Sequence, residues 1–165
     1  MRGFRVGNGF DAHRLAAGRP LMLGGIEVPF PRGLEGHSDG DCLLHAICDA
    51  LLGAAGAGDM GRHFPSSDSR WKGAASRLFL QETGRLVAAA GFVVENVDAT
   101  IVAQAPVLAP YLDAMRDAVA SALEIDVTLV SIKAKSTDGL GAIGRGEGMA
   151  ATASALLRRS SETLT

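Results

Sequence analysis

HSDGDCLLHAICDALLGA, residues 37–54, is the stretch of this sequence that decides the fold. Its apolar side chains recur every three or four residues, which is the spacing of one face of an α-helix. A second face carries ionisable side chains one turn apart, at Asp41, His45 and Asp49. The pattern predicts an amphipathic helix over residues 38–55 with a polar stripe that is available for chemistry.

Upstream, the stretch GFDAHRL, residues 9–15, places Asp11 and His13 two residues apart on a predicted strand. Side chains at that spacing project from the same face, so a carboxylate oxygen and an imidazole nitrogen can converge on one cation. His45 can supply a third ligand, and three nitrogen or oxygen ligands leave one tetrahedral position open, as in catalytic zinc sites. Asp41 and Asp49 are then expected to accept the second ring N–H of His45.

Other interpretations of these residues stay open on the sequence alone. The Asp-x-His pair can be an ordinary surface feature of a strand, with His45 a hydrogen-bonded core histidine. His37 and Ser38 stand where a helix N-terminus offers backbone N–H groups and a positive dipole to an anion such as phosphate. Alternatively, Ser38 or Asp39 is only the N-cap of the helix.

The rest of the chain alternates strand and helix patterns, which predicts a single domain over residues 1–165. Because a predicted hairpin comes early, we expect a mixed β-sheet with helices on one side, in an α/β (α+β layered) fold. The loop 56–73 is long enough to indicate a binding segment. The expected elements are a strand at 4–12, a hairpin at 21–28, helices at 74–90 and 110–123, strands at 97–104 and 127–135, and a final helix ending near residue 159.

Composition restricts the function classes. The chain has 165 residues, a net charge of −2 and no long basic run, so we expect a small ligand and no nucleic-acid partner. No charged-then-apolar leader follows Met1 and no apolar run reaches about 18 residues, so we expect a cytoplasmic protein without a membrane partner. Cys42 and Cys48 are too far apart on one helix for a disulfide and are expected to be buried thiols.

Polar residues end the last predicted strand. Lys135, Ser136, Thr137 and Asp138 lie where ligand-binding groups often collect in open α/β sheets, although a polar strand end without function is an equal alternative. GRGEG, residues 144–148, lacks the spacing of nucleotide-binding glycine motifs, so turn formation is its expected role.

Six segments, in their order and spacing, carry a resemblance that runs almost from end to end of the chain. They are GFDAH, GHSDGDCLLHAICDALLGAAGAGDMGRHFP, WKG, NVDATIVAQAP, SIKAKSTDGLG and GRGEG. Together they resemble the 2-C-methyl-D-erythritol 2,4-cyclodiphosphate synthase family of the non-mevalonate isoprenoid pathway. The resemblance implies a homotrimer of α/β subunits with active sites between neighbours.

The resemblance also implies a reaction, that of a phosphorus–oxygen lyase. The family's substrate is 4-diphosphocytidyl-2-C-methyl-D-erythritol 2-phosphate, whose 2-phosphate attacks its own β-phosphorus and expels CMP. By resemblance, Zn²⁺ is held by Asp11, His13 and His45. Mg²⁺ or Mn²⁺, bridging the substrate phosphates, is held by Asp138.

Catalytic roles carry over to His37, which matches the family's transition-state-stabilising histidine, and to Ser136, whose hydroxyl matches that of a Thr. Asp138 stands where the family has Glu, and Ser66 stands where Asp is common. Val107 replaces a residue that is often Lys. The implied substrate-binding residues are Asp11, His13, His37, Ser38, Asp59, Met60, Gly61, Phe64, Pro65, Ser66, Ser67, Asp68, Ala103, Gln104, Ala105, Pro106, Val107, Leu108, Ala109, Lys135, Ser136, Thr137, Asp138, Ala142 and Arg145.

Two rival functions use the same residues. One is a zinc phosphohydrolase in which Asp11, His13 and His45 activate water toward a diphosphate. The other is a non-enzymatic module that binds nucleotides or isoprenoid phosphates and needs the metal for folding. Reaction products distinguish the first rival from the cyclase, and the effect of chelation on folding distinguishes the second.

Overall fold

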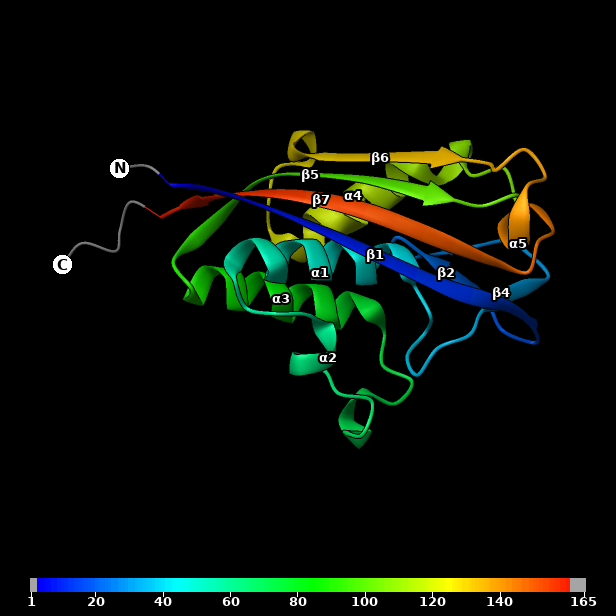
Figure 1. Cartoon of the computed structure of the whole chain (residues 1–165), viewed down its shortest axis with the longest axis horizontal. Helices are drawn as coiled ribbons and strands as arrows, with labels where there is room; N and C mark the ends of the chain where they lie inside the picture. The colour runs from blue at the N-terminus through cyan, green and yellow to red at the C-terminus, as the bar shows by residue number, and fades with distance from the viewer. Residues whose placement is uncertain (1–2, 161–165) are drawn as a thin grey trace.

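The computed structural model describes residues 3–160 and contains a five-stranded β-sheet of order β4-β1-β7-β5-β6 (Figure 1). Neighbouring strands are antiparallel except β5 and β6, which are parallel, so the prediction of a mixed sheet is confirmed. The strands of this sheet are β1 (Phe4–Ala17), β4 (Arg32–Leu34), β5 (Phe92–Val102), β6 (Val130–Lys135) and β7 (Gly148–Arg159).

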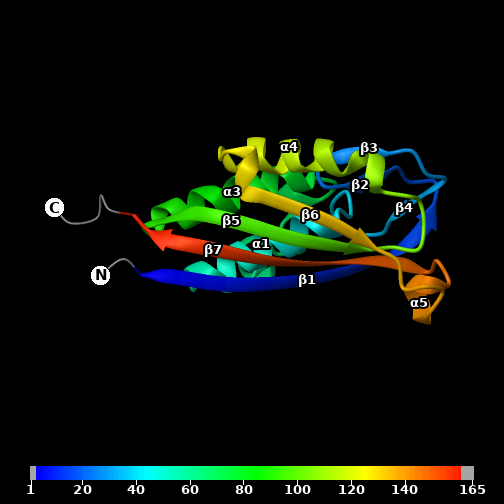
Figure 2. The ribbon, with the colours of Figure 1, turned by 90° about the horizontal axis from the view of Figure 1, so that it is seen from above.

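Within the described part of the chain, three long helices lie on one face of the sheet, and no element covers the other face (Figure 2). Strands β2 (Leu21–Leu23) and β3 (Ile26–Val28) form the predicted hairpin, which is a separate two-stranded sheet. The helices are α1 (Cys42–Ala55), α2 (Met60–His63), α3 (Ser76–Ala89), α4 (Leu112–Leu123) and α5 (Gly141–Gly144), with short 3₁₀ turns η1 (Ser69–Trp71), η2 (Ala109–Tyr111) and η3 (Val127–Leu129).

Helix α1 packs directly on the backbone of β1, because glycines alternate along the side of β1 that faces it. A Cβ built on Gly7 would lie 2.1 Å from the carbonyl oxygen of Ala50, and one built on Gly9 would lie 2.1 Å from that of Ala46. Real side chains cannot occupy that space. The two glycines therefore bring the polar stripe of α1 close to the strand that carries Asp11 and His13.

The helix expected near the end of the chain is wrong, because residues 148–159 form strand β7 at the centre of the sheet. Its alanines favoured helix on propensity, but alternate residues of this strand are buried against α1. Burial between two neighbouring strands and a helix outweighs a propensity of less than about 1 kcal/mol per residue. The period-2 pattern is visible in the sequence, at Met149, Ala151, Ala153, Ala155 and Leu157.

The N-cap of α1 is Asp41, so both candidates from the sequence, Ser38 and Asp39, are wrong. The fully buried Asp41 carboxylate accepts hydrogen bonds from Leu44 N at 3.0 Å and from the two backbone N–H groups of the Gly24–Gly25 turn at 3.0 and 2.7 Å. One side chain thus begins α1 and fixes the β2–β3 hairpin against it.

The other predicted strands and helices are present with different ends, whereas β4 and α5 were not predicted. Strand β1 runs to Ala17, beyond the predicted residue 12, and the long loop 56–73 contains α2 and η1. Cys42 and Cys48 are buried free thiols, as predicted. Within residues 3–160, none of the helices has the length and apolar character needed to cross a bilayer.

The first prediction concerns the contact between α1 and β1. Gly9→Ala is expected to lower the free energy of unfolding by about 3 kcal/mol, the upper end for overpacking, because its Cβ meets backbone rather than a flexible side chain. Urea denaturation measures this loss. Gly3→Ala, where a Cβ meets nothing within 4 Å, is the control and should change stability by less than about 0.5 kcal/mol. Equal effects of the two substitutions would contradict the packing argument.

Candidate active site

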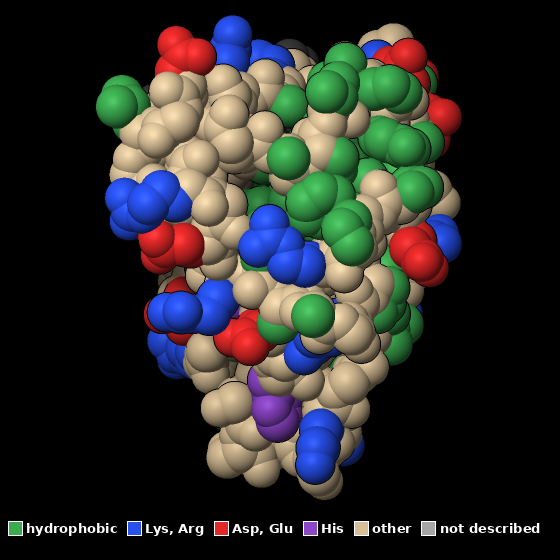
Figure 3. All heavy atoms as spheres, turned by 90° about the vertical axis from the view of Figure 1, so that its right-hand side faces the viewer, with side chains coloured by type: hydrophobic (Ala, Val, Ile, Leu, Met, Phe, Trp, Pro, Cys, Tyr) green, Lys and Arg blue, Asp and Glu red, His purple; other side chains and the backbone are tan. Residues whose placement is uncertain are grey.

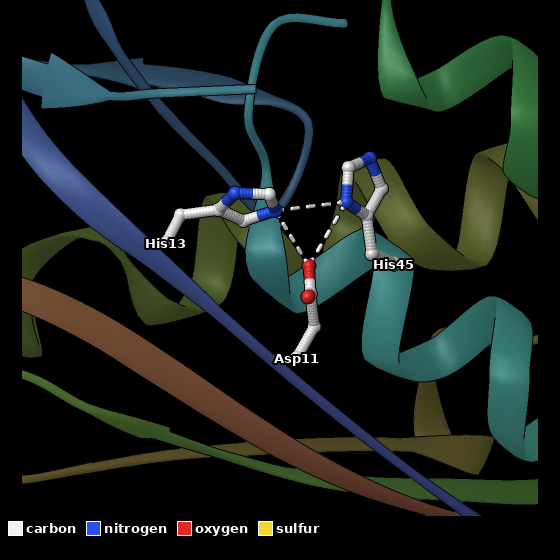
Figure 4. A group of neighbouring side chains, drawn as sticks. All are labelled: Asp11, His13 and His45. Carbon is white, nitrogen blue, oxygen red and sulfur yellow. Dashed lines mark hydrogen bonds and ion pairs between the residues drawn. The ribbon is translucent and has the colours of Figure 1, made fainter. Parts of the chain in front are cut away.

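Three predicted metal ligands meet at one point between β1 and α1 (Figure 4). Asp11 Oδ2 lies 2.7 Å from His13 Nε2 and 2.9 Å from His45 Nδ1, and the two ring nitrogens are 3.3 Å apart. Asp11 and His13 share the face of β1 that lies under α1, as their spacing predicted, and His45 reaches them from the helix. One carboxylate oxygen and two imidazole nitrogens form a donor set suited to zinc.

The charges of this cluster favour cation binding. Burial raises the pKa of Asp11, but its contacts with the ring nitrogens of His13 and His45 outweigh burial and hold that pKa well below its usual value. The hydrogen bond that His13 donates to the Asp11 carboxylate raises the pKa of His13. Asp11 is therefore ionised at neutral pH, as a metal ligand must be.

The second ring nitrogen of His45 bonds to serine hydroxyls rather than to the predicted carboxylates. His45 Nε2 lies 2.9 Å from Ser76 Oγ and 3.2 Å from Ser38 Oγ. The expectation that Asp41 and Asp49 accept this N–H is wrong. Asp41 serves the helix cap and the hairpin, while Asp49 accepts Met60 N at 2.8 Å and so anchors α2.

A cavity of about 170 Å³ opens beside the three ligands. It brings together side chains from β1, the loop before α1, α1 itself, the α2 region and α3. Its lining residues are His13, His37, Ser38, His45, Met60, Phe64, Ser66, Trp71 and Phe79. A ligand held at the metal position therefore meets the exposed His37 imidazole on one side and a cluster of aromatic rings on the other.

The predicted binding loop after α1 is ordered by its own carboxylates. Asp59 caps α2 by accepting Arg62 N at 3.0 Å, and Gly61 lies in that first turn. Asp68 accepts Arg70 N at 3.0 Å and pairs with the Arg70 guanidinium at 2.6 Å, which lowers the pKa of Asp68. The neighbouring Pro65 and Ser67 lie in the same loop, on either side of Ser66, which lines the cavity.

A second group of predicted residues lines a different cavity, of about 250 Å³, at the other edge of the sheet. The register runs from Asp11 through Ala151 and Ile101 to Ala134, so three strand spacings, about 14 Å, separate β1 from β6. Buried core residues lie between them. The predicted residues at this second cavity are Ala103, Gln104, Pro106, Val107, Leu108, Ala109, Lys135 and Ser136, with Ala105 in the same loop.

The loop after β6 holds the remaining predicted residues. Asp138 has a positive φ of 57° and is exposed, and its N–H donates to Ser136 Oγ at 3.4 Å. Thr137 Oγ1 donates to the carbonyl of Leu140 at 2.7 Å. Among the described residues, Asp138 is not part of the acid and histidine group that could hold a metal.

Helix α5 follows this loop and contains Ala142, and Arg145 at its end pairs with Glu147 at 2.6 Å. Figure 3 shows this end of the molecule, where side chains of both charge signs are interspersed and hydrophobic side chains gather toward one side. Val107 and Leu140, from the loops after β5 and β6, are exposed by 77% and 74%.

Three comparisons with known proteins agree with one another. The model of the YgbB family matches residues 4–158. Proteins of Burkholderia mallei and Burkholderia pseudomallei named 2-C-methyl-D-erythritol 2,4-cyclodiphosphate synthase are 56% identical over 156 residues, which is 94% of this chain and 96% of theirs.

Solved structures share the fold over nearly the whole chain. The bifunctional IspDF of Campylobacter jejuni has a TM-score of 0.93 and 40% identity, and the match covers 96% of this chain and 43% of that protein. The CDP complex of IspF from Plasmodium falciparum has a TM-score of 0.85 and 30% identity, with 97% of this chain and 99% of that chain covered.

The second prediction tests the ligand set. His45→Ala is expected to reduce the zinc that copurifies with the protein at least about tenfold, because two ligands remain where three converged. Elemental analysis measures the metal, and circular dichroism checks the fold. His63→Ala removes a histidine that bonds to Ala57 O and does not line the cavity, so this control should keep its zinc. Equal zinc content in both variants would show that His45 is not a zinc ligand.

Proposed function

Because this chain belongs to the YgbB family, we propose that it is a 2-C-methyl-D-erythritol 2,4-cyclodiphosphate synthase, a phosphorus–oxygen lyase of isoprenoid precursor biosynthesis. The observation that carries the proposal is the Asp11, His13 and His45 cluster beside a cavity that His37 lines, in a chain 56% identical to proteins of that name. The whole chain then acts as one catalytic domain.

The proposed reaction is intramolecular. An oxygen of the 2-phosphate of 4-diphosphocytidyl-2-C-methyl-D-erythritol 2-phosphate forms a bond to the β-phosphorus, and the bond from that phosphorus to the oxygen bridging it to the α-phosphate breaks. CMP leaves with the bridging oxygen, and the remaining product is the cyclic 2,4-diphosphate. The nucleophile is already anionic and tethered, so the protein supplies orientation and charge stabilisation rather than a nucleophile of its own.

The residues around the 170 Å³ cavity suit that task. His37 is exposed to the cavity and is placed to donate a hydrogen bond to a phosphate oxygen. Ser38 lies beside it, before α1, and Met60 and Phe64 give the cavity an apolar wall that excludes water from the carbon skeleton. A substrate that folds back on itself here brings its two phosphate groups within reach of each other.

The donor set of Asp11, His13 and His45 fits Zn²⁺, which when bound supplies Lewis-acid polarisation of a phosphoryl oxygen. Asp138 is proposed as the protein ligand of a Mg²⁺ or Mn²⁺ ion. Such an ion takes most of its ligands from substrate phosphates and water, so a single exposed carboxylate suffices. Ser136 contributes a hydroxyl next to that carboxylate and is proposed as a second phosphate contact.

We assign the 250 Å³ cavity at the β5 and β6 edge to the cytosine ring. This cavity is lined by the loop between Ala103 and Ala109 together with the end of β6 and Leu112, and we propose that backbone N–H and carbonyl groups of this loop supply the polar recognition. Solved relatives named as CDP complexes support a cytidine nucleotide as ligand. Val107 presents an exposed apolar side chain at this edge.

A homotrimer completes the site. Within one chain the two cavities are separated by three strand spacings, about 14 Å, and by buried core. The uncovered sheet face carries Phe4, Val6 and Phe10, which are exposed by 56%, 74% and 64%. Packing this face against two further copies buries these side chains and brings the β6 edge of one copy toward the β1 edge of the next.

The third prediction concerns the reaction itself. Purified protein incubated with zinc, magnesium and the cytidine diphosphate substrate is expected to yield CMP and a cyclic diphosphate, because the nucleophile is internal. Phosphorus NMR distinguishes the cyclic product by its two coupled phosphorus resonances. CMP together with a linear phosphorylated product would instead identify a phosphohydrolase.

The fourth prediction concerns assembly. Phe10→Asp is expected to reduce the mass in solution to about a third and to abolish turnover, because a charge buried at the interface is costly and the site loses its second half. Light scattering and sedimentation measure the mass. Leu78→Asp, at a residue of α3 that is 51% exposed on the helical side, is the control and should stay assembled. An unchanged mass for Phe10→Asp would exclude this face as the interface.

A further inference from the structure

We propose that Asp39 and Ser76 are positioning residues that fix which ring nitrogen of His45 faces the metal. This inference rests on the zinc centre of the proposed function and extends it to two side chains that do not contact the cation. Asp39 lies in the loop before α1, and Ser76 is the first residue of α3. Neither follows from the spacing of the ligands in the sequence.

The three side chains form a continuous hydrogen-bonded chain. Asp39 Oδ2 accepts Ser76 N at 2.9 Å, Asp39 Oδ1 accepts the Ser76 hydroxyl in a short contact, and Ser76 Oγ lies 2.9 Å from His45 Nε2. Ser76 is fully buried, so no water competes for its hydroxyl. The opposite ring nitrogen, His45 Nδ1, is the one beside Asp11.

We call the hydrogen-bonded series Asp39–Ser76–His45 the relay. The donor and acceptor properties of its groups fix the direction of each hydrogen bond in it. A carboxylate has no proton to donate, so the Ser76 hydroxyl proton points to Asp39. Ser76 Oγ can then only accept from His45, which requires the proton of a neutral imidazole to lie on Nε2. Nδ1 is left with its lone pair toward the position where Asp11 and His13 converge. A relay that ran the other way would place the proton where the metal must bind.

Ser38 does not reverse this direction. Its Oγ is farther from His45 Nε2, at 3.2 Å, and it accepts the N–H of Gly40 at 3.3 Å. Its own proton has an acceptor in Ser76 Oγ, 3.4 Å away, which still has a lone pair available. Ser38 thus adds a second contact around the same hydroxyl without competing for the Asp39 carboxylate.

The relay also connects two loops that form the cavity. Gly73 N donates to His37 O at 2.9 Å, and Asp39 N donates to Ala74 O at 3.2 Å, so the segment before α1 and the segment before α3 run side by side. The Asp39–Ser76 bonds close this pairing next to the metal ligands. The orientation of His45 is therefore set by the same contacts that hold His37 in place.

A zinc-affinity measurement tests the relay in the full-length protein. Ser76→Ala removes only the hydroxyl and keeps the N–H that Asp39 caps, and it is expected to weaken zinc binding at least about tenfold, the usual size for loss of an outer partner of a ligating histidine. Competition with a chelator of known affinity gives the dissociation constant. In the zinc-loaded parent, ¹H–¹⁵N spectra are expected to show the His45 proton on Nε2 in slow exchange with water, and Ser76→Ala should speed that exchange.

Asp39→Asn completes a double-mutant cycle, because it replaces one of the two accepting carboxylate oxygens with an NH₂ group, which donates and cannot accept a hydrogen bond from Ser76. It should weaken zinc binding in the parent but add nothing in the Ser76→Ala background, since the relay is then already broken. The matched control is Asp126→Asn, away from the cavity, where one carboxylate oxygen, Oδ1, accepts both the N–H and the hydroxyl of Thr128, at 2.8 and 2.6 Å. This control should bind zinc within twofold of the parent.

The outcomes separate this inference from the proposed function. Zinc binding by Ser76→Ala within twofold of the parent, or independent effects of Ser76→Ala and Asp39→Asn, would overturn the relay while leaving the metal centre intact. A parent protein that binds no zinc would overturn the metal centre, and the relay with it. Product formation by the parent, followed by phosphorus NMR, tests the cyclase separately from either result.

Discussion

The close approach of α1 to the backbone of β1 is the contact on which the rest of this structure depends. The helix can lie this near because Gly7 and Gly9 present no side chains to it, and because it faces the strand with Ala46 and Ala50. Metal ligands must converge within a few ångströms, so a helix held one side chain farther away would leave His45 short of the pair on β1. The close packing of α1 on β1 is therefore also what allows the three candidate ligands to converge.

The three ionisable side chains of the α1 stripe, Asp41, His45 and Asp49, each contact a different segment of the chain. Asp41 is buried, which raises its pKa, and its carboxylate is fully engaged by the start of α1 and the β2–β3 turn. His45 turns to the metal position, and Asp49 holds the first N–H of α2. Because the two carboxylates have backbone partners, neither competes with Asp11 for the cation. The helix positions the ligand and also both loops that border the cavity.

Sequence reasoning found the ligands because each lies on a regular element. Periodicity placed Asp11 and His13 on one strand face and His45 on a helix stripe, and the family resemblance then joined them as one ligand set, which the structure brings together. The hydrogen-bond partner of His45 Nε2 was missed because Ser76 lies 31 residues away in the sequence. Helix and strand periodicity relate only residues of one element, so they cannot predict this contact. Strand β7 was missed because alanine favours helices when nothing else is known, and only burial between β1 and β5 decides otherwise.

The arrangement of the sheet explains why one subunit does not suffice for the proposed chemistry. A substrate with a nucleotide at one end and two phosphates at the other needs a nucleotide cavity and a metal centre that face each other across open space. In this chain the candidate ligands lie on β1 and α1, and the second cavity lies at the end of β6, with Ala151 and Ile101 buried between the two strands. A path through the core is closed, so the two must meet around the outside of the sheet. The uncovered face with Phe4, Val6 and Phe10 is the surface across which a neighbouring copy can bring its β6 edge to this β1 edge. In the proposed trimer, association would complete the site and cover the apolar face in a single step.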